Sequence, residues 1–297
     1  MAIRQNGDDL EDDFVLDDLV ALSEDENDIQ ELLSVDEDAV EDPVADAEKK
    51  AKAEGDQAKK RKQRGKEKER KAKKRKLTES SNTTPHESLT AQPPPALQVY
   101  INAMQAKTFS TMSTLELEDV SIPENSIADT TIWTGPRTLD TLVEFITEAL
   151  PTLRTRLSQK SKSNGAPTLL FVTGAALRVA DVTRVLKDKE LRGEKGGDVA
   201  KLFAKHFKLA EHVTYLKRTK VGAAVGTPGR IGKLLCETDA LSIPALTHIM
   251  LDVTYQDSKK RNLLDIQETR DEVFKTVLGG EKVKEAIKAG KIQVVLF

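Results

Sequence analysis

The stretch that decides the fold is residues 221–252, VGAAVGTPGRIGKLLCETDALSIPALTHIMLD. Its first apolar run, residues 221–225, stops at the turn 226–230, and apolar side chains then follow at helical spacing. A second apolar run, residues 247–251, ends at Asp252. The pattern predicts a βαβ unit of a parallel sheet, whose strands end at the edge where α/β proteins usually bind ligands.

The turn between the first strand and the helix has the features of an anion site. Thr227 is placed to cap the helix, and Pro228 suits its first position, where a missing N–H costs nothing. Gly229 keeps side-chain bulk away from amides that attract a phosphate, and Arg230 adds a charged donor. We predict a phosphate contact by Thr227, Gly229 and Arg230. The alternative is that Arg230 pairs with a nearby carboxylate or caps local carbonyls.

The rest of the chain, from the first helix onwards, alternates between helices and strands. A helix is expected near Ala96, followed by an irregular strap, residues 113–133, that Trp133 anchors to the domain. This alternation predicts an α/β fold with a three-layer parallel sheet. Further elements are expected as a helix from 138 to Pro151, a strand at 169–173, helices at 175–190 and 198–208, a strand at 213–216, a polar helical region after Asp252, a helix at 281–289 and a last strand at 291–297.

Charge divides the 297 residues into three blocks, although the net charge is only −3. Residues 8–48 hold nineteen Asp and Glu and no Lys or Arg, whereas residues 49–76 hold sixteen Lys and Arg against four acids. The remainder, 77–297, is nearly balanced, with 29 basic and 26 acidic residues. We predict an acidic tail without a stable fold at 1–48, a basic segment at 49–76, a Ser/Thr/Pro-rich linker at 77–95 and a folded domain at 96–297.

The basic segment fits a nuclear or nucleolar address and a nonspecific RNA contact, since each neutralised phosphate releases counterions. A merely solvated segment is the alternative. The RNA-contacting side chains predicted there are Lys59, Lys60, Arg61, Lys62, Lys73, Lys74, Arg75 and Lys76.

Cysteine and histidine usage gives no sign of a metal site or a cofactor. Cys236 is the only cysteine, which excludes an intrachain disulfide, and we expect it to be a small buried core residue. The four histidines lack ligand-like spacing. No apolar run is long enough to span a membrane, so we expect a soluble intracellular protein that contacts no membrane.

Residues 138–297 resemble the first RecA-like domain of DEAD-box RNA helicases. LLFVTGAALRVADV at 169–182, VGTPGR at 225–230, IMLD at 249–252 and QVVLF at 293–297 match four of their motifs in order. The resemblance implies that the turn at 227–230 binds RNA phosphate, that Arg178 belongs to the same site, and that Asp252 stands at a degenerate Walker B position.

The nucleotide-hydrolysis motifs of those enzymes are missing from this sequence. Lys follows Gly only at residues 66, 233 and 291, and no glycine precedes those pairs at the spacing that a phosphate-binding loop requires. Val253, Thr254 and Tyr255 replace the residues that follow Asp252, so no carboxylate is left to orient water. We predict that the chain has no catalytic residues and is not an enzyme.

The whole chain also resembles the Cms-one family of small-subunit homologues, through LELED at 115–119, the Trp133 segment, TLDTLVEF at 138–145, GAALRVADV at 174–182 and VGTPGRIGKLL at 225–235. This resemblance implies a nucleolar protein of the 90S pre-ribosome, or small-subunit processome. Its expected partners are pre-rRNA or small nucleolar RNA and protein components of that particle, which it joins as a monomer.

Three functions remain open on the sequence alone. The first is a non-enzymatic RNA- or ribonucleoprotein-binding module, and the second is a protein-only scaffold in the same particle. The third, an ATP-dependent helicase, is disfavoured by the missing motifs and the missing second lobe. RNA crosslinks within the folded domain would separate the first function from the second.

Overall fold

The computed structural model describes residues 89–205 and 207–297. Within them, five parallel strands form one sheet in the order β2-β3-β1-β4-β5. The predicted βαβ unit is present as β3, α12 and β4, with β1 inserted between its two strands. The strands are β1 (Leu169–Val172), β2 (Asp198–Leu202), β3 (Val221–Gly226), β4 (His248–Leu251) and β5 (Gln293–Leu296).

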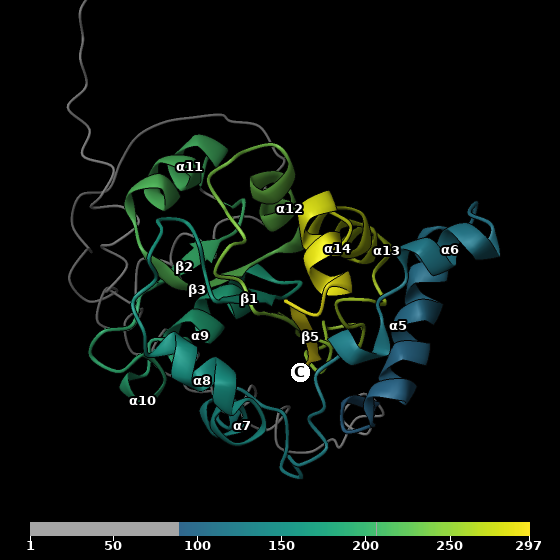
Figure 1. Ribbon diagram of the computed structural model, residues 1–297, viewed down its shortest axis with the longest axis horizontal. Coiled ribbons are helices and arrows are strands. Elements are labelled where there is room, and N and C mark those ends of the chain that lie inside the picture. Colours follow the sequence, from purple (N-terminus) through teal and green to yellow (C-terminus); the bar gives the residue numbers. More distant parts are fainter. Residues whose placement is uncertain (1–88, 206) are drawn as a thin grey trace, which may run out of the picture.

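Helices cover both faces of the sheet, as predicted for a three-layer α/β fold (Figure 1). Successive strand residues point to opposite layers: Leu170 and Val172 pack in the core with α11, α12 and α14, while Leu169 and Phe171 pack in the core with α7, α8 and α9. The helices are α5 (Pro94–Thr108), α6 (Thr114–Val120), α7 (Leu142–Ala149), α8 (Pro151–Leu157), α9 (Ala176–Leu186), α10 (Lys189–Arg192), α11 (Leu209–Arg218), α12 (Pro228–Cys236), α13 (Gln267–Glu272) and α14 (Glu281–Lys288), with a 3₁₀ turn η1 (Glu124–Ser126) and a π-helical turn η2 (Val273–Val277).

The sequence predicted a helix followed by a strand in residues 198–216, and the structure has a strand followed by a helix. The helix expected at 198–208 begins as strand β2, and the strand expected at 213–216 lies inside helix α11. Strand β2 is buried on both faces, so its apolar side chains give no clean alternation, and its parallel pairing with β3 fixes the structure. Val213 and Tyr215 pack against the same core as Leu209 and Leu216 of the helix, so they belong to a helical face.

The strap contains more regular structure than the sequence predicted. Residues 114–120 form α6, because the side chain of Ser113 caps the helix and Glu116 bonds back to the Ser113 amide at 2.7 Å. Trp133 anchors the strap as expected, since the residue is 7% exposed and its ring meets Phe145 edge-on at 5.9 Å between centroids. Pro151 does not end the helical region but opens α8 at its first turn.

The strap also covers one edge of the sheet. Ile127 forms a parallel bridge with Val294 of the edge strand β5, and the Ala128 amide donates to the Val294 carbonyl at 2.9 Å. Just beyond the strap, the buried Arg137 donates to the Leu296 carbonyl at 3.0 Å. The strap is therefore hydrogen-bonded to the last strand along its outer side.

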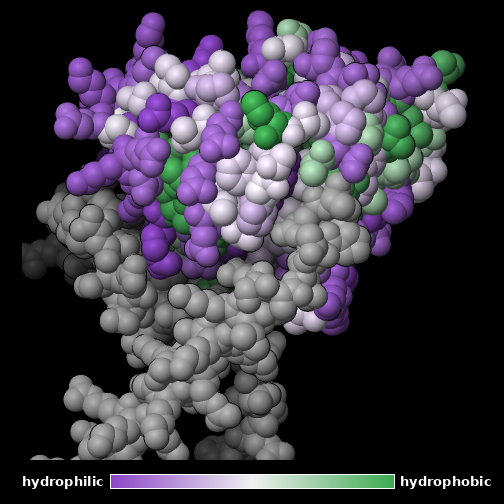
Figure 2. All heavy atoms as spheres, turned by 90° about the horizontal axis from the view of Figure 1, so that it is seen from below, coloured by the Kyte–Doolittle hydropathy of each residue, from purple (hydrophilic) through white to green (hydrophobic). Residues whose placement is uncertain are grey.

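The exposed apolar side chains are scattered over different segments. Val99, Leu115 and Ile132 are 70%, 74% and 72% exposed and come from α5, α6 and the strap. The face seen in Figure 2 is mainly hydrophilic where described residues are visible, with green side chains in separate groups. Cys236 is exposed at the end of α12, so the prediction that its thiol is buried was wrong. Its position on the helix turns it away from the core and towards the Thr276 carbonyl, 3.4 Å from its Sγ.

Candidate nucleic-acid interface

Three strands end side by side where the sequence placed its candidate residues. The register pairs Val172 of β1 with Gly226 of β3 and with Leu251 of β4. Because all three strands are parallel, the residues that follow them, including Thr227 and Asp252, meet at the carboxyl edge of the sheet. The structure thus brings the GTPGR turn, the start of α9 with Arg178, and Asp252 to one edge.

Arg178 and Asp252 form a buried ion pair at this edge. The Arg178 Nε and Nη2 donate to the two carboxylate oxygens at 3.0 and 3.4 Å, and the Thr173 hydroxyl donates to Asp252 Oδ2 at 2.9 Å. The two residues are 5% and 1% exposed, and the guanidinium lies 4.8 Å from the centre of the Tyr255 ring. Both oxygens of the Asp252 carboxylate are therefore occupied by protein donors.

The start of α12 already holds an anionic group of the protein itself. Thr227 occupies the N-cap position, but its side chain makes no capping hydrogen bond. The Gly229 amide bonds to the Glu272 carboxylate, and a Cβ added at residue 229 would lie 2.5 Å from Glu272 Oε1. Burial raises the pKa of Glu272, while the Gly229 amide and the nearby Lys233 oppose that shift. The absence of a side chain at residue 229 thus lets a carboxylate approach amides that the sequence assigned to a phosphate.

Arg230 points inward rather than along the surface. It is 7% exposed, and its Nη2 donates to the Phe207 carbonyl at 2.6 Å, which is the carbonyl-capping role that the sequence left as an alternative. Its Nη1 is also buried and has no acceptor among the described residues. Burial lowers the pKa of Arg230, with Glu211 opposing the shift. Burial, with a smaller contribution from Arg230, also lowers the pKa of His212 to about 4.

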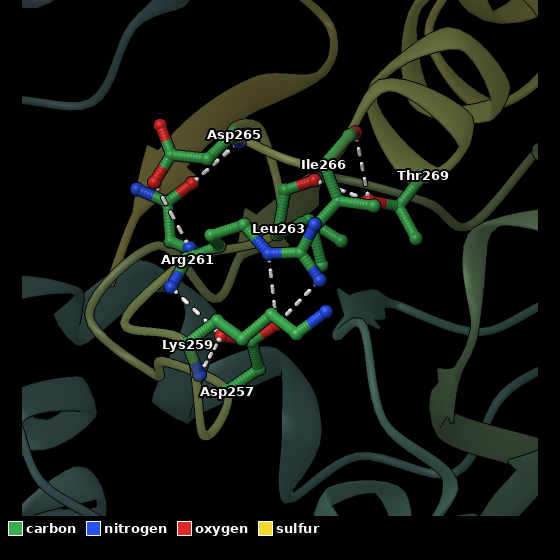
Figure 3. Close-up of polar contacts among 8 residues, drawn as sticks. Asp257, Lys259, Arg261, Leu263, Asp265, Ile266 and Thr269 are labelled. Carbon is green, nitrogen blue, oxygen red and sulfur yellow. Dashed lines mark hydrogen bonds and ion pairs between the residues drawn. The ribbon is translucent and has the colours of Figure 1, made fainter.

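A basic turn after β4 completes the edge, and the sequence reasoning missed it. The region after Asp252 was expected to be helical, but α13 begins only at Gln267. Instead the carboxylate of Asp257 accepts hydrogen bonds from the Lys259 and Arg261 amides at 2.7 and 2.9 Å and from the Arg261 guanidinium at 2.8 Å (Figure 3). These bonds, led by the one from the Arg261 amide, lower the pKa of Asp257.

The same turn fixes where its positive charges lie. Lys260 adopts a left-handed backbone conformation with φ of 58°, which closes the turn and leaves Lys259, Lys260 and Arg261 exposed. Since Arg261 is paired with Asp257, the two lysines supply the net charge of the turn. The run SKKR at 258–261, next to Asp257, was the signal that could have revealed a turn, because Asp side chains bond to amides two residues ahead.

The predicted contacts in the basic segment, from Lys59 to Lys76, lie outside the described residues. In 89–205 and 207–297, no group of three or more His, Cys, Asp or Glu side chains is arranged to hold a metal ion. None of the helices in that part of the chain is both long and apolar enough to cross a bilayer.

The chain is similar in sequence to curated proteins from fungi and vertebrates. Protein CMS1 of Chaetomium thermophilum is 42% identical over 168 residues, which cover 56% of this chain and 65% of that protein. Protein cms1 of Schizosaccharomyces pombe is 33% identical over 183 residues, covering 62% of each chain. Protein CMSS1 of Homo sapiens is 28% identical over 208 residues, covering 70% of each. The chain thus spans somewhat less than two thirds of the length of the two fungal relatives.

Solved structures of DEAD-box proteins are similar at lower identity. A DEAD-box protein from Methanococcus jannaschii is 18% identical with a TM-score of 0.33, over 56% of this chain and 37% of that one. The yeast DEAD-box splicing factor Prp28 is 17% identical with a TM-score of 0.38, over 55% of this chain and 34% of that one. The family model described as "CMS1: U3-containing 90S pre-ribosomal complex subunit" matches residues 44–297, and the chain therefore belongs to the CMS1 family of 90S pre-ribosomal complex subunits.

Proposed function

We propose that this chain is a non-enzymatic RNA-binding subunit of the 90S pre-ribosome that acts in nucleolar assembly and rRNA processing of the small subunit. The observation that carries the proposal is the family match over residues 44–297, which includes the whole basic segment as well as the whole folded domain. A U3-containing particle supplies both pre-rRNA and small nucleolar RNA as partners, together with protein components. Work in that particle takes place in the nucleolus, within the nucleus.

The carboxyl edge supports the non-enzymatic part of the proposal. Hydrolysis of a nucleotide needs a cradle for its phosphates, a carboxylate for magnesium and a group that orients water. Asp252, the one acid left in place, is 1% exposed and bonded to Arg178 and Thr173. Calorimetry of the full-length protein with Mg-ATP should therefore show no tight binding, and a turnover assay should show no phosphate release. Micromolar affinity with measurable turnover would establish an enzyme instead.

The same edge supports RNA contact through charges that are not consumed within the fold. Lys259 and Lys260 are exposed on a turn whose backbone Asp257 holds in place. Arg230 has one buried Nη1 donor without an acceptor among the described residues, and such a donor costs about 1–3 kcal/mol when it stays unpaired. An RNA phosphate that displaced the Glu272 carboxylate would meet the Gly229 amide, and the Arg230 side chain would have to turn outward to offer that donor to it. The turn then makes one contact with the RNA backbone, through Thr227, Gly229 and Arg230. Such a contact does not distinguish one base from another.

A protein-only scaffold is the second candidate, and the internal pairing of the two arginines favours it. Arg178 is committed to Asp252, and Arg230 already bonds the Phe207 carbonyl. On this view the edge is a structural remnant, and only the basic segment meets RNA.

The two candidates are separated by RNA binding and crosslinking. Arg230→Ala in the full-length protein should weaken binding to single-stranded RNA by about 1.5–3 kcal/mol, roughly ten- to hundredfold, if the turn holds a phosphate. Arg184→Ala, on the exposed side of α9, is the matched control and should change affinity little. Ultraviolet crosslinking within assembled particles should give RNA adducts in the folded domain. A lower melting temperature with unchanged RNA affinity, and adducts confined to residues 49–76, would favour the scaffold.

A further inference from the structure

The opposite edge of the sheet carries a basic cleft that the sequence did not single out. A cleft of about 790 Å³ opens between helix α8, the loop that leads into β1 and the segment that leads into β4. Three cations line it, Arg156, Lys160 and Lys162, and no carboxylate does. The remaining lining side chains are mostly neutral hydrogen-bonding groups: Thr152, Thr155, Gln159, Ser161, Ser163 and Thr168. Cations without a counter-charge bind phosphate oxygens, whereas the Thr155 and Ser161 hydroxyls already donate to protein carbonyls.

The loop that presents these cations has a fixed backbone. The Gly165 amide donates to the Thr219 carbonyl at 2.9 Å, and the Gly165 carbonyl accepts from the Ser242 amide at 2.8 Å. Gly165 has φ of +60°, and a Cβ there would lie 2.0 Å from the Ala240 carbonyl oxygen, so only glycine fits. The Ser161 hydroxyl donates to a carbonyl of the same loop, that of residue 163, at 2.9 Å. Lys160 and Lys162 therefore extend from a backbone that is already ordered.

The positive charge continues along this edge beyond the cleft. The Asn164 side chain donates to the Lys217 carbonyl at 2.9 Å, which places the end of α11 beside the loop. Lys217, Arg218 and Lys220 are all exposed there. Arg156, Lys217 and Arg218 lie in last turns of helices, where cations also complement the helix dipole. Lys160 and Lys162 lie beyond the end of α8, so the helix dipole does not account for positive charge at these two positions.

We infer that this cleft binds the sugar-phosphate backbone of RNA, at a site separate from the GTPGR turn. The inference rests on the proposed function and names a binding surface for it. The cleft volume is within the ~300–1,000 Å³ range of ligand clefts, which leaves room for more than one phosphate. The strands between the two edges have four to six residues, so the two sites lie roughly 13–20 Å apart. An acidic protein segment fits less well, because the lining offers only Pro151, Pro244 and Ala245 as apolar partners for an anchor residue.

The test replaces the three lining cations in the full-length protein, as Arg156→Gln/Lys160→Gln/Lys162→Gln. The control, Lys107→Gln/Lys189→Gln/Lys282→Gln, removes the same charge from exposed positions elsewhere. Binding to single-stranded RNA is titrated at several salt concentrations. We expect the cleft variant alone to reduce the slope of log K against log salt by about 2, which is ~0.7 for each of three phosphates. Crosslinked RNA should also be found on residues 152–168 of the wild-type chain.

Three results would overturn the inference. One is equal salt slopes for the two triple variants, and another is a set of RNA crosslinks that omits the cleft. The third is amine-to-carboxyl crosslinking that joins Lys160 or Lys162 to an acidic protein segment, such as residues 8–48, while RNA is bound. Crosslinks in residues 49–76 alone would refute the cleft and leave RNA binding intact. Absence of RNA crosslinks from the entire chain would refute the proposed function as well.

Discussion

Replacing Arg178 by Met tests whether the carboxyl edge is held together by its buried ion pair. Asp252 is 1% exposed, so its carboxylate would stay buried after the change. Of the side-chain donors that bond it in the described part of the chain, the Thr173 hydroxyl would remain. Removing one partner of a buried pair costs about 3–5 kcal/mol, because the other charge stays desolvated. In a domain of this size each kcal/mol shifts the melting temperature by about 2–4 °C, so a fall of about 6–20 °C is expected.

The assays are thermal melting and urea unfolding of the full-length protein, both followed by fluorescence of Trp133. This is the only tryptophan of the chain, and the residue is 7% exposed in the folded state. Arg184→Met on the same helix is the control, because Arg184 and Asp181 form a pair 3.3 Å apart with side chains 56% and 33% exposed. An exposed pair of this kind is worth about 0–1 kcal/mol.

A double variant separates the ion pair from simple packing. Arg178→Met combined with Asp252→Leu removes both charges, and apolar replacement of a complete buried pair is often close to neutral. The double variant should therefore be more stable than Arg178→Met alone. The reasoning fails if Arg178→Met costs no more than Arg184→Met, or if the double variant loses the sum of the two single effects. A stable Arg178→Met protein with reduced RNA affinity would show that Arg178 serves RNA rather than Asp252.

Three further predictions follow from buried and close contacts. Burial holds the pKa of His212 at about 4, below its usual 6.5, so protonation of His212 should cost the wild type about 3 kcal/mol of stability as the pH falls from 6.5 to 4. His212→Phe should abolish this part of the pH dependence, which melting curves at several pH values would show. Gly232→Ala should cost about 1–3 kcal/mol, because a Cβ there would lie 2.0 Å from Thr276 Oγ1, whereas Gly174→Ala, with its nearest atom at 3.8 Å, should cost less in the same unfolding assay. Cys236 should react with one equivalent of a thiol reagent without denaturant, and a thiol that reacts only after unfolding would contradict its exposed position.

The strands with strong local signals could be predicted from the sequence. β1, β3, β4 and β5 are short continuous apolar runs, and the turn at residue 226 is marked by Gly and Pro. β2 was predicted as a helix and part of α11 as a strand, because the apolar patterns of these segments are ambiguous over a few residues. For β2, pairing with β3 decides the structure, and no property of residues 198–202 reports that partner.

The candidate site was predictable as a location but not as a set of interactions. Consecutive parallel strands bring their last residues to one edge, so the sequence placed Thr227 and Asp252 together correctly. The partners that now define the edge come from distant parts of the chain. Arg178 meets Asp252 from 74 residues away, and Glu272 meets Gly229 from a different helix. Such pairings follow from packing, which local patterns of residues do not contain.

The cover that the strap places over β5 has a consequence for aggregation. A strand at the border of a sheet carries unpaired amides and carbonyls that can recruit a strand of another molecule. Ile127 and Ala128 occupy part of that border at Val294, and they are synthesised long before β5 leaves the ribosome. The cover is thus available as soon as the strand is made. A fragment that begins after Arg137 would lack the cover and expose a strand of sequence QVVL, and we expect it to self-associate where the intact chain does not.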